Sequence, residues 1–132
     1  MFLNRLSEAE KNAFLQLAHH IARTDNRFSE EEELLIAKYC MEMQMDDIDF
    51  ADSTFDLSTV LGTFEENSHR KIVLLEIMSL VYADGVETEE EKAVIKQMIA
   101  LFGLNPNLAI VYREWAKSIL ALYIQGEALI HL

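Results

Sequence analysis

The sequence predicts an all-α protein, a bundle of about six to seven helices. Glycine and proline, which disfavour helices most, are scarce, with four Gly and one Pro in 132 residues. Signals for the start of a helix recur along the chain, and no stretch shows the sustained alternation of a strand. A chain of this length with 51% apolar and 26% charged residues is typical of one globular domain, here residues 1–132.

Three capping boxes predict where three of the helices begin. Each has a hydroxyl residue at the N-cap and a glutamate three residues later, so that side chains and backbone exchange two hydrogen bonds. The boxes pair Ser7 with Glu10, Ser29 with Glu32, and Thr88 with Glu91. Apolar residues that follow them at helical spacing predict helices over 8–24, 30–44 and 88–102.

Weaker signals predict the loop and the helices in the middle of the chain. Residues 45–55 are rich in aspartate and are interpreted as a solvated loop. Asp56 is predicted to cap a short helix over 57–63. A longer helix is predicted to follow, with Asn67 or Ser68 as its cap.

The last helix is predicted over 106–124. Gly103 suits the left-handed position that ends the preceding helix. Asn105 followed by Pro106 is a strong start signal, because proline is well accommodated at the first position of a helix. Gly126 is expected to break the last helix.

An internal repeat organises the chain. Asp25 and the seven residues after it align with Asp84 and the seven residues after it, at an offset of 59 residues. Both segments read Asp, Asn or Gly, two spacer residues, Ser or Thr, and three Glu. The repeat therefore predicts two pseudo-symmetric helix–acidic turn–helix units, over about 8–44 and about 68–102.

The conformation of the two turns follows from their residues. Asn26 and Gly85 tolerate the left-handed conformation that ends a helix. A carboxylate at the end of a helix is unfavourable by roughly 0.3–1 kcal/mol, because it faces the negative end of the helix dipole. Asp25 and Asp84 therefore either point forward to the next helix or face a cation, and both explanations stay open.

A resemblance to a known family rests on the second turn, YADGVETEEE from Tyr82 to Glu91. This segment resembles the signature turn of the TerB-like, tellurite-resistance family, and the flanking helices and the first unit extend the resemblance over most of the chain. The resemblance implies an all-α bundle with internal pseudo-symmetry and a non-enzymatic, stress-associated role. It also implies peripheral membrane complexes and acidic turns that bind a divalent metal.

Four metal ligands are implied by the resemblance. They are Asp84 and Glu91 in the second unit and Asp25 and Glu32 in the first, with Ca²⁺ or another divalent cation as the expected cofactor. The first unit departs from the family pattern, since its turn has Asn26 in place of Gly, Thr24 in place of Ala, and the positive charge of Arg27. These departures weaken the expectation for the first turn more than for the second.

Charge and composition restrict the partners. With 11 Lys and Arg against 23 Asp and Glu, the net charge is −12, which disfavours nucleic acid and anionic membrane surfaces. No apolar run reaches the roughly 20 residues of a membrane span, so no integral membrane segment is expected. The only cysteine, Cys40, is expected to be a small core residue, and a cytoplasmic location follows from the absence of a disulfide framework.

Two side-chain groups have more than one interpretation. The aspartates of residues 45–56 attract a divalent cation loosely or form a solvated loop. The histidines, including the adjacent His19 and His20, are expected at the surface or its boundary, because neighbours on a helix point about 100° apart and cannot share one metal.

Three functional hypotheses remain. The leading one is a TerB-like interaction module whose acidic turns bind a divalent cation. The alternative is a metal-free protein–protein adaptor or homodimer, which uses its acidic surface and the last helix, apolar nearly all round from 119 to 124. A carboxylate-based hydrolase is the third. In the first two, the partner is a protein or a second copy, and contact with a membrane is made through a partner.

Overall fold

The computed structural model describes residues 1–26 and 28–132 and is helical, as predicted. Arg27, whose charge the sequence puts in the first turn, lies outside the described residues. Within them, 71% of the chain is helix and none is strand. The elements in order are η1 (Leu3–Arg5), α1 (Glu8–Ala22), α2 (Glu30–Met43), η2 (Asp52–Thr54), α3 (Leu57–Leu61), α4 (Asn67–Val81), α5 (Glu89–Phe102) and α6 (Asn107–Ile130).

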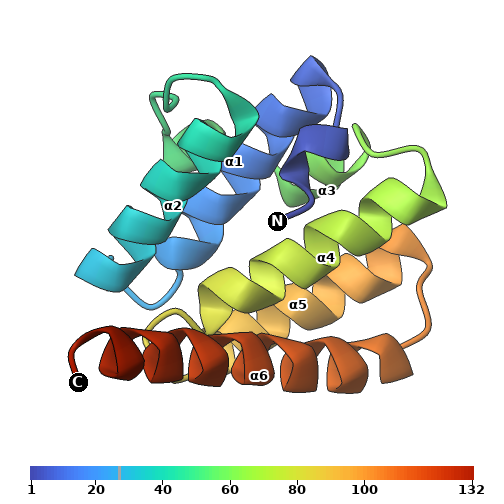
Figure 1. Ribbon diagram of the computed structural model, residues 1–132. Helices are drawn as coiled ribbons and strands as arrows, with labels where there is room; N and C mark the ends of the chain where they lie inside the picture. Colours follow the sequence, from blue (N-terminus) through green and yellow to red (C-terminus); the bar gives the residue numbers. More distant parts are fainter. Residues whose placement is uncertain (27) are drawn as a thin grey trace.

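Two helical hairpins and a long last helix make up the bundle (Figure 1). The first hairpin is α1 with α2, the second is α4 with α5, and α6 runs along one end of the molecule. The first helices of the two hairpins are central, since α1 contacts α2, α3 and α4, while α4 contacts α1, α5 and α6. The repeat therefore places equivalent helices at the centre of the fold.

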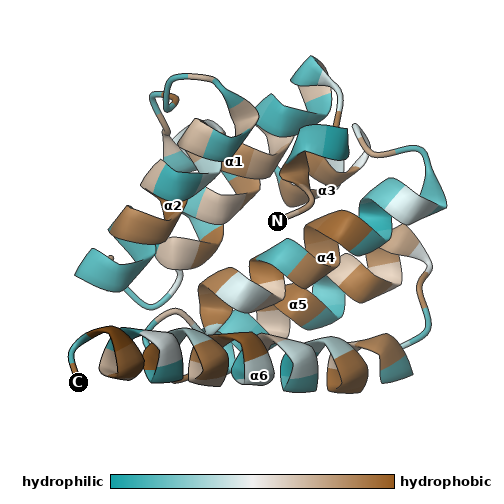
Figure 2. Ribbon diagram, in the orientation of Figure 1, coloured by the Kyte–Doolittle hydropathy of each residue, from teal (hydrophilic) through white to brown (hydrophobic). Residues whose placement is uncertain are grey.

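Burial follows the repeat residue by residue. Leu15 and Leu74, at equivalent positions of α1 and α4, are both fully buried, and so are Ile21 and Leu80. Figure 2 shows apolar residues recurring along the hairpin helices between hydrophilic ones. Burial of this apolar surface is the main stabilising contribution to such a bundle.

All three predicted capping boxes form. At Ser7, Ser29 and Thr88 the hydroxyl accepts from the N–H of the glutamate three residues later, and that glutamate accepts from the N–H of the cap. The left-handed turn positions are also confirmed. The φ angle is 59° at Asn26, 86° at Gly85 and 67° at Gly103.

The end of the last helix and the cap of α4 differ from the prediction, and α1 and α3 each end two residues earlier than predicted. The last helix does not end near residue 124 but continues through Gly126 to Ile130. A single glycine costs a helix only about 1 kcal/mol relative to alanine, and Glu127, Ala128 and Leu129 after it favour continuation. At the other boundary, α4 already begins at Asn67, after Glu66, whose side chain makes no capping hydrogen bond.

Candidate functional site

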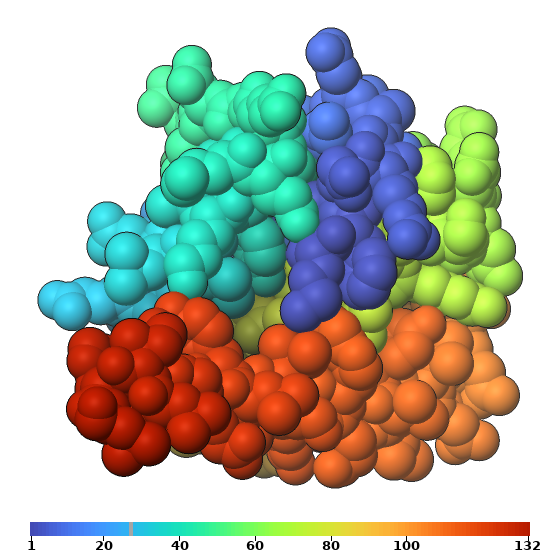
Figure 3. All heavy atoms as spheres, viewed as in Figure 1, coloured from blue at the N-terminus to red at the C-terminus, as the bar shows by residue number. Residues whose placement is uncertain are grey.

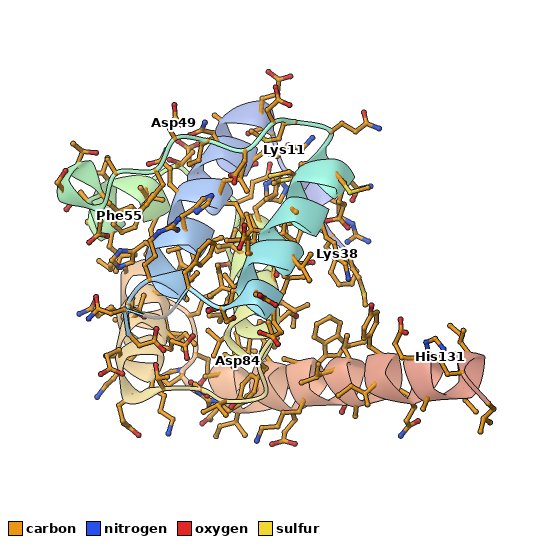
Figure 4. All side chains as sticks on the ribbon, turned by 90° about the vertical axis from the view of Figure 1, so that its left-hand side faces the viewer. Lys11, Lys38, Asp49, Phe55, Asp84 and His131 are labelled. Atoms are coloured by element: carbon orange, nitrogen blue, oxygen red, sulfur yellow. The ribbon has the colours of Figure 1, made fainter. Side chains whose placement is uncertain are left out.

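The two acidic turns lie close together at one end of the bundle (Figures 1 and 4). Their charges interact: Asp84 and Asp25 both act on Glu32, and Glu32 and Asp25 both act on Glu91. Folding thus brings the four predicted carboxylates, from two segments 59 residues apart, into one electrostatic group. Sequence spacing alone does not give this proximity, because it depends on how the two hairpins pack.

Glu32 and Glu91 are buried at the centre of this group and serve as capping residues. Each is less than 5% exposed. The Ser29 N–H donates to Glu32 Oε1 at 3.0 Å, and the Thr88 N–H donates to Glu91 Oε1 at 2.8 Å. These bonds satisfy the first backbone donors of α2 and α5, so both carboxylates are part of the helix starts.

The surroundings raise the pKa of both buried glutamates. Burial is the largest cause, because it disfavours the charged form. The capping hydrogen bonds act in the opposite direction, and the neighbouring carboxylates raise the pKa further. The pKa of Glu91 is raised from 4.5 to about 7, so this carboxyl titrates near neutral pH.

Asp84 points forward along the chain. Its Oδ1 accepts a hydrogen bond from the Val86 N–H at 3.1 Å, which closes a turn around Gly85. This is the forward-pointing arrangement that one of the two explanations for an aspartate at this helix end requires. Asp84 is exposed, and its counterpart Asp25 is half-buried.

The four carboxylates do not form a preassembled metal site. Among the residues that the structure describes, no group of three or more His, Cys, Asp or Glu side chains is placed to hold one ion. Ca²⁺ takes roughly six to eight oxygen ligands, whereas Glu32 and Glu91 each already use one oxygen in a cap. The negative charges therefore converge without bringing their ligand atoms to one point.

A buried ion pair connects the second turn to α6. The Arg113 Nε and Nη2 donate to the two carboxylate oxygens of Glu87 at 2.6 and 2.9 Å, and the Tyr82 hydroxyl donates to Glu87 at 2.6 Å. Burial opposes the charge of Glu87, but these donors hold its pKa below the usual value. The first unit has Phe28 at the equivalent position, so this connection belongs to the second unit alone.

The aspartate-rich loop is tied to α1, which the sequence did not indicate. Asp47 Oδ1 lies 2.7 Å from His19 Nε2, and Asp52 Oδ1 lies 3.0 Å from His20 Nδ1. The expectation of a boundary position is wrong for His19, which is 4% exposed and stacks on Phe50. The aromatic residues within the loop were the sequence signal for this packing, because a fully solvated loop rarely contains several aromatic side chains.

An apolar groove lies between α2, the end of α4 and α6. Its volume is about 290 Å³. Its lining is mostly apolar and includes three polar or charged residues, Glu31, Lys38 and Ser79. The lining includes Leu34, Leu35, Tyr82, Ile119, Leu120 and Tyr123. The Lys38 Nζ lies 5.0 Å from the centre of the Tyr123 ring, so this side chain spans the groove from α2 to α6.

The C-terminal half of α6 extends past the rest of the bundle. In Figure 4 it projects beyond the other helices, with His131 near its free end. Figure 3 shows α6 as the whole lower border of the molecule, and apolar residues continue to its end in Figure 2. Leu122, Tyr123, Ile124, Leu129 and Ile130 are each more than half exposed. Adjacent exposed apolar side chains of this kind are typical of an interaction surface.

Within the described residues, no helix is long and apolar enough to cross a membrane. Comparison of the chain with protein-family models, with curated proteins and with solved structures gives no match.

Proposed function

We propose that the chain is a non-enzymatic, TerB-like interaction module that binds a protein partner through the groove and the C-terminal half of α6. The observation that carries this proposal is the uncovered apolar surface, which combines a groove of about 290 Å³ with a projecting apolar helix. Grooves with helical walls accept the apolar face of another helix. The partner is therefore a protein that presents such a face.

The chemistry of the reactive side chains supports a binding role. Glu32 and Glu91 are engaged in helix caps, and Glu87 is engaged with Arg113. Burial and nearby aspartates raise the pKa of the Cys40 thiol to about 11, which makes it a poor nucleophile. A cytoplasmic location is part of the proposal, because this single buried cysteine leaves no disulfide to form within the chain.

Site-specific photo-crosslinking in cells tests the proposal. A photoreactive amino acid replaces Leu120 in the groove or, as a control, the exposed Asp49, which lies far from α6 (Figure 4). The expected result is an adduct of defined mass from position 120 and none from position 49. Absence of an adduct at 120, or equal adducts at both positions, would contradict the proposal.

Divalent-cation binding by the two turns is a second candidate. The observation that favours it is the convergence of four carboxylates, whose charges add to the larger effect of burial in raising the pKa of Glu32 and Glu91. A cation held near the turns would offset this repulsion and stabilise the native state, since a ligand that binds only the folded chain raises its melting temperature.

Thermal melting of the EDTA-treated chain with and without Ca²⁺, Mg²⁺ or Zn²⁺ tests this candidate. One ion is expected to raise the melting temperature, and the double variant Asp84→Asn/Glu91→Gln is expected to lose that rise. Asp49→Asn, which removes a charge far from the turns, should retain it. The same rise in melting temperature in all three proteins would indicate general charge screening and would refute cation binding by the turns.

A further inference from the structure

The uncovered part of α6 needs apolar cover from outside the chain. The end of α6 toward His131 extends beyond the other helices (Figure 4). Leu122 is 61% exposed, Leu129 67% and Ile130 75%. A helix that is apolar on several sides is normally surrounded, because each exposed apolar side chain loses the free energy of burial. The bundle covers only one face of this segment, so its other apolar side chains stay exposed.

Residues 118–126 of this helix are free of charge. Between Lys117 and Glu127, no residue of α6 carries a charged side chain, although the chain as a whole has a net charge of −12. Two copies of such an acidic chain repel one another over most of their surfaces. Two copies can approach without bringing like charges together at the uncharged segment of α6.

The groove has a basic side chain that an acidic one on α6 can meet. Among the described residues that line it, Lys38 is basic and Glu31 acidic, and the Lys38 Nζ lies 5.0 Å from the centre of the Tyr123 ring on α6. On α6, Tyr123, Glu127 and Ile130 share a face, because residues four and seven positions apart align on a helix. Glu127 is half exposed. An incoming copy of this face thus offers an apolar side chain to the groove and a carboxylate to Lys38.

We infer that the partner is a second copy of this chain, an assignment that rests on the proposed docking surface. The C-terminal half of α6 in each copy lies antiparallel along that of the other. Ile130 of each copy enters the groove of the other, and Glu127 lies beside Lys38 of the other. This contact uses the same surface on both copies, so it closes as a two-fold dimer.

Leu129 and Ile130 are exposed and are not among the residues that line the groove, so an occupant confined to the groove leaves them uncovered. The antiparallel copy covers the groove and the projecting end of α6 together. The dimer thereby accounts for both uncovered features with one contact.

The solution mass of the full chain tests the inference. Sedimentation equilibrium is expected to give a dimer of the 15.2 kDa chain. Ile130→Glu should raise the dissociation constant at least about tenfold, because it places a charge where an apolar side chain is buried. Ile110→Glu is the matched control, since Ile110 is 61% exposed on the first half of α6. It should leave the dissociation constant unchanged.

Charge reversal tests the orientation of the two copies. Lys38→Glu and Glu127→Lys are each expected to weaken the dimer roughly threefold to tenfold, as repulsion replaces an ion pair at a rim. The double variant Lys38→Glu/Glu127→Lys should restore it, because the pair is then reversed. Circular dichroism and melting temperature establish that each variant keeps its fold.

Three results would overturn the inference: a wild-type monomer at every concentration, a dimer that tolerates Ile130→Glu, or a double reversal that restores nothing. The crosslink from position 120 separates this failure from failure of the proposed function. If the chain is a monomer that crosslinks to a different protein, the proposed docking surface is supported and the dimer is refuted. If the chain is a monomer that gives no crosslink, both proposals are refuted.

Discussion

Glu10 and Glu91 occupy the same position of the same capping motif, but their surroundings shift the pKa in opposite directions. At Glu91, burial and then the charges of Glu32 and Asp25 outweigh the cap and raise the pKa to about 7. At Glu10, burial is outweighed by the Ser7 N–H and by His69, whose Nδ1 lies 2.9 Å from Glu10 Oε1, and the pKa is lowered. The motif fixes the hydrogen bonds, and the neighbours decide whether the charge stabilises the fold.

Glu91→Gln is expected to flatten the pH dependence of stability. The folded-state pKa of Glu91 lies above its ordinary value of 4.5, so ionisation opposes folding and the free energy of unfolding decreases as pH rises from about 4.5 through 7. Glutamine at this position still caps Thr88. Urea unfolding between pH 5 and 8 should therefore show a smaller decrease for the variant than for the wild type. An identical decrease would refute this assignment.

Glu10→Gln is expected to act with the opposite sign. A lowered pKa means that the charged carboxylate stabilises the fold above pH 4.5 and that this contribution is lost as pH falls through the folded-state pKa. Loss of the charge-assisted contact with His69 should reduce the free energy of unfolding at pH 7 by about 1 kcal/mol. The same urea series measures it, and a stabilised variant would contradict the argument.

At the scale of single residues, the sequence predicts what is local. The capping boxes and the positive φ angles of Asn26 and Gly85 depend on a few neighbouring residues, and all were predicted correctly. The burial of His19 depends on Asp47 and Phe50, about 30 residues away in the chain. Contacts between distant segments leave no comparable local pattern.

Among the elements, α6 departs furthest from its predicted bounds. Gly126 lies inside the helix, and a Cβ added there would meet nothing within 4 Å. A glycine with helical geometry and free space is replaced by alanine without strain. Gly126→Ala should therefore raise the free energy of unfolding by about 0.5–1 kcal/mol in thermal or urea melts. A destabilised variant would mean that the backbone at this position is not regular helix.

The attachment of α6 to the second turn depends on Arg113. The Glu87 side chain is only 2% exposed. Arg113→Ala leaves this buried carboxylate without its cationic partner. The expected loss of stability is about 2–4 kcal/mol, measured by urea unfolding. Glu114→Ala on the same helix removes an exposed partner of Lys117 and should change the stability by less than about 0.5 kcal/mol. Equal effects of the two variants would refute the role of the buried pair.

For the whole molecule, the internal repeat predicted the pair of hairpins but not the surface that they form with α6. The all-α class follows from composition and from helix signals. The proximity of the acidic turns and the groove both require the packing of α2, α4 and α6, which periodicity does not encode. The apolar run from 119 to 124 indicated an interface or a central helix, and the exposure of Leu122 and Ile124 favours the interface.

The comparison of crosslinks from positions 120 and 49 decides whether the chain binds its partner through the groove and α6. We expect adducts at the groove position alone, and their mass identifies the partner as a second copy or as another protein. Adducts of equal yield from Asp49, on the far side of the bundle, or none from Leu120, would contradict the claim that the chain acts through the groove and α6.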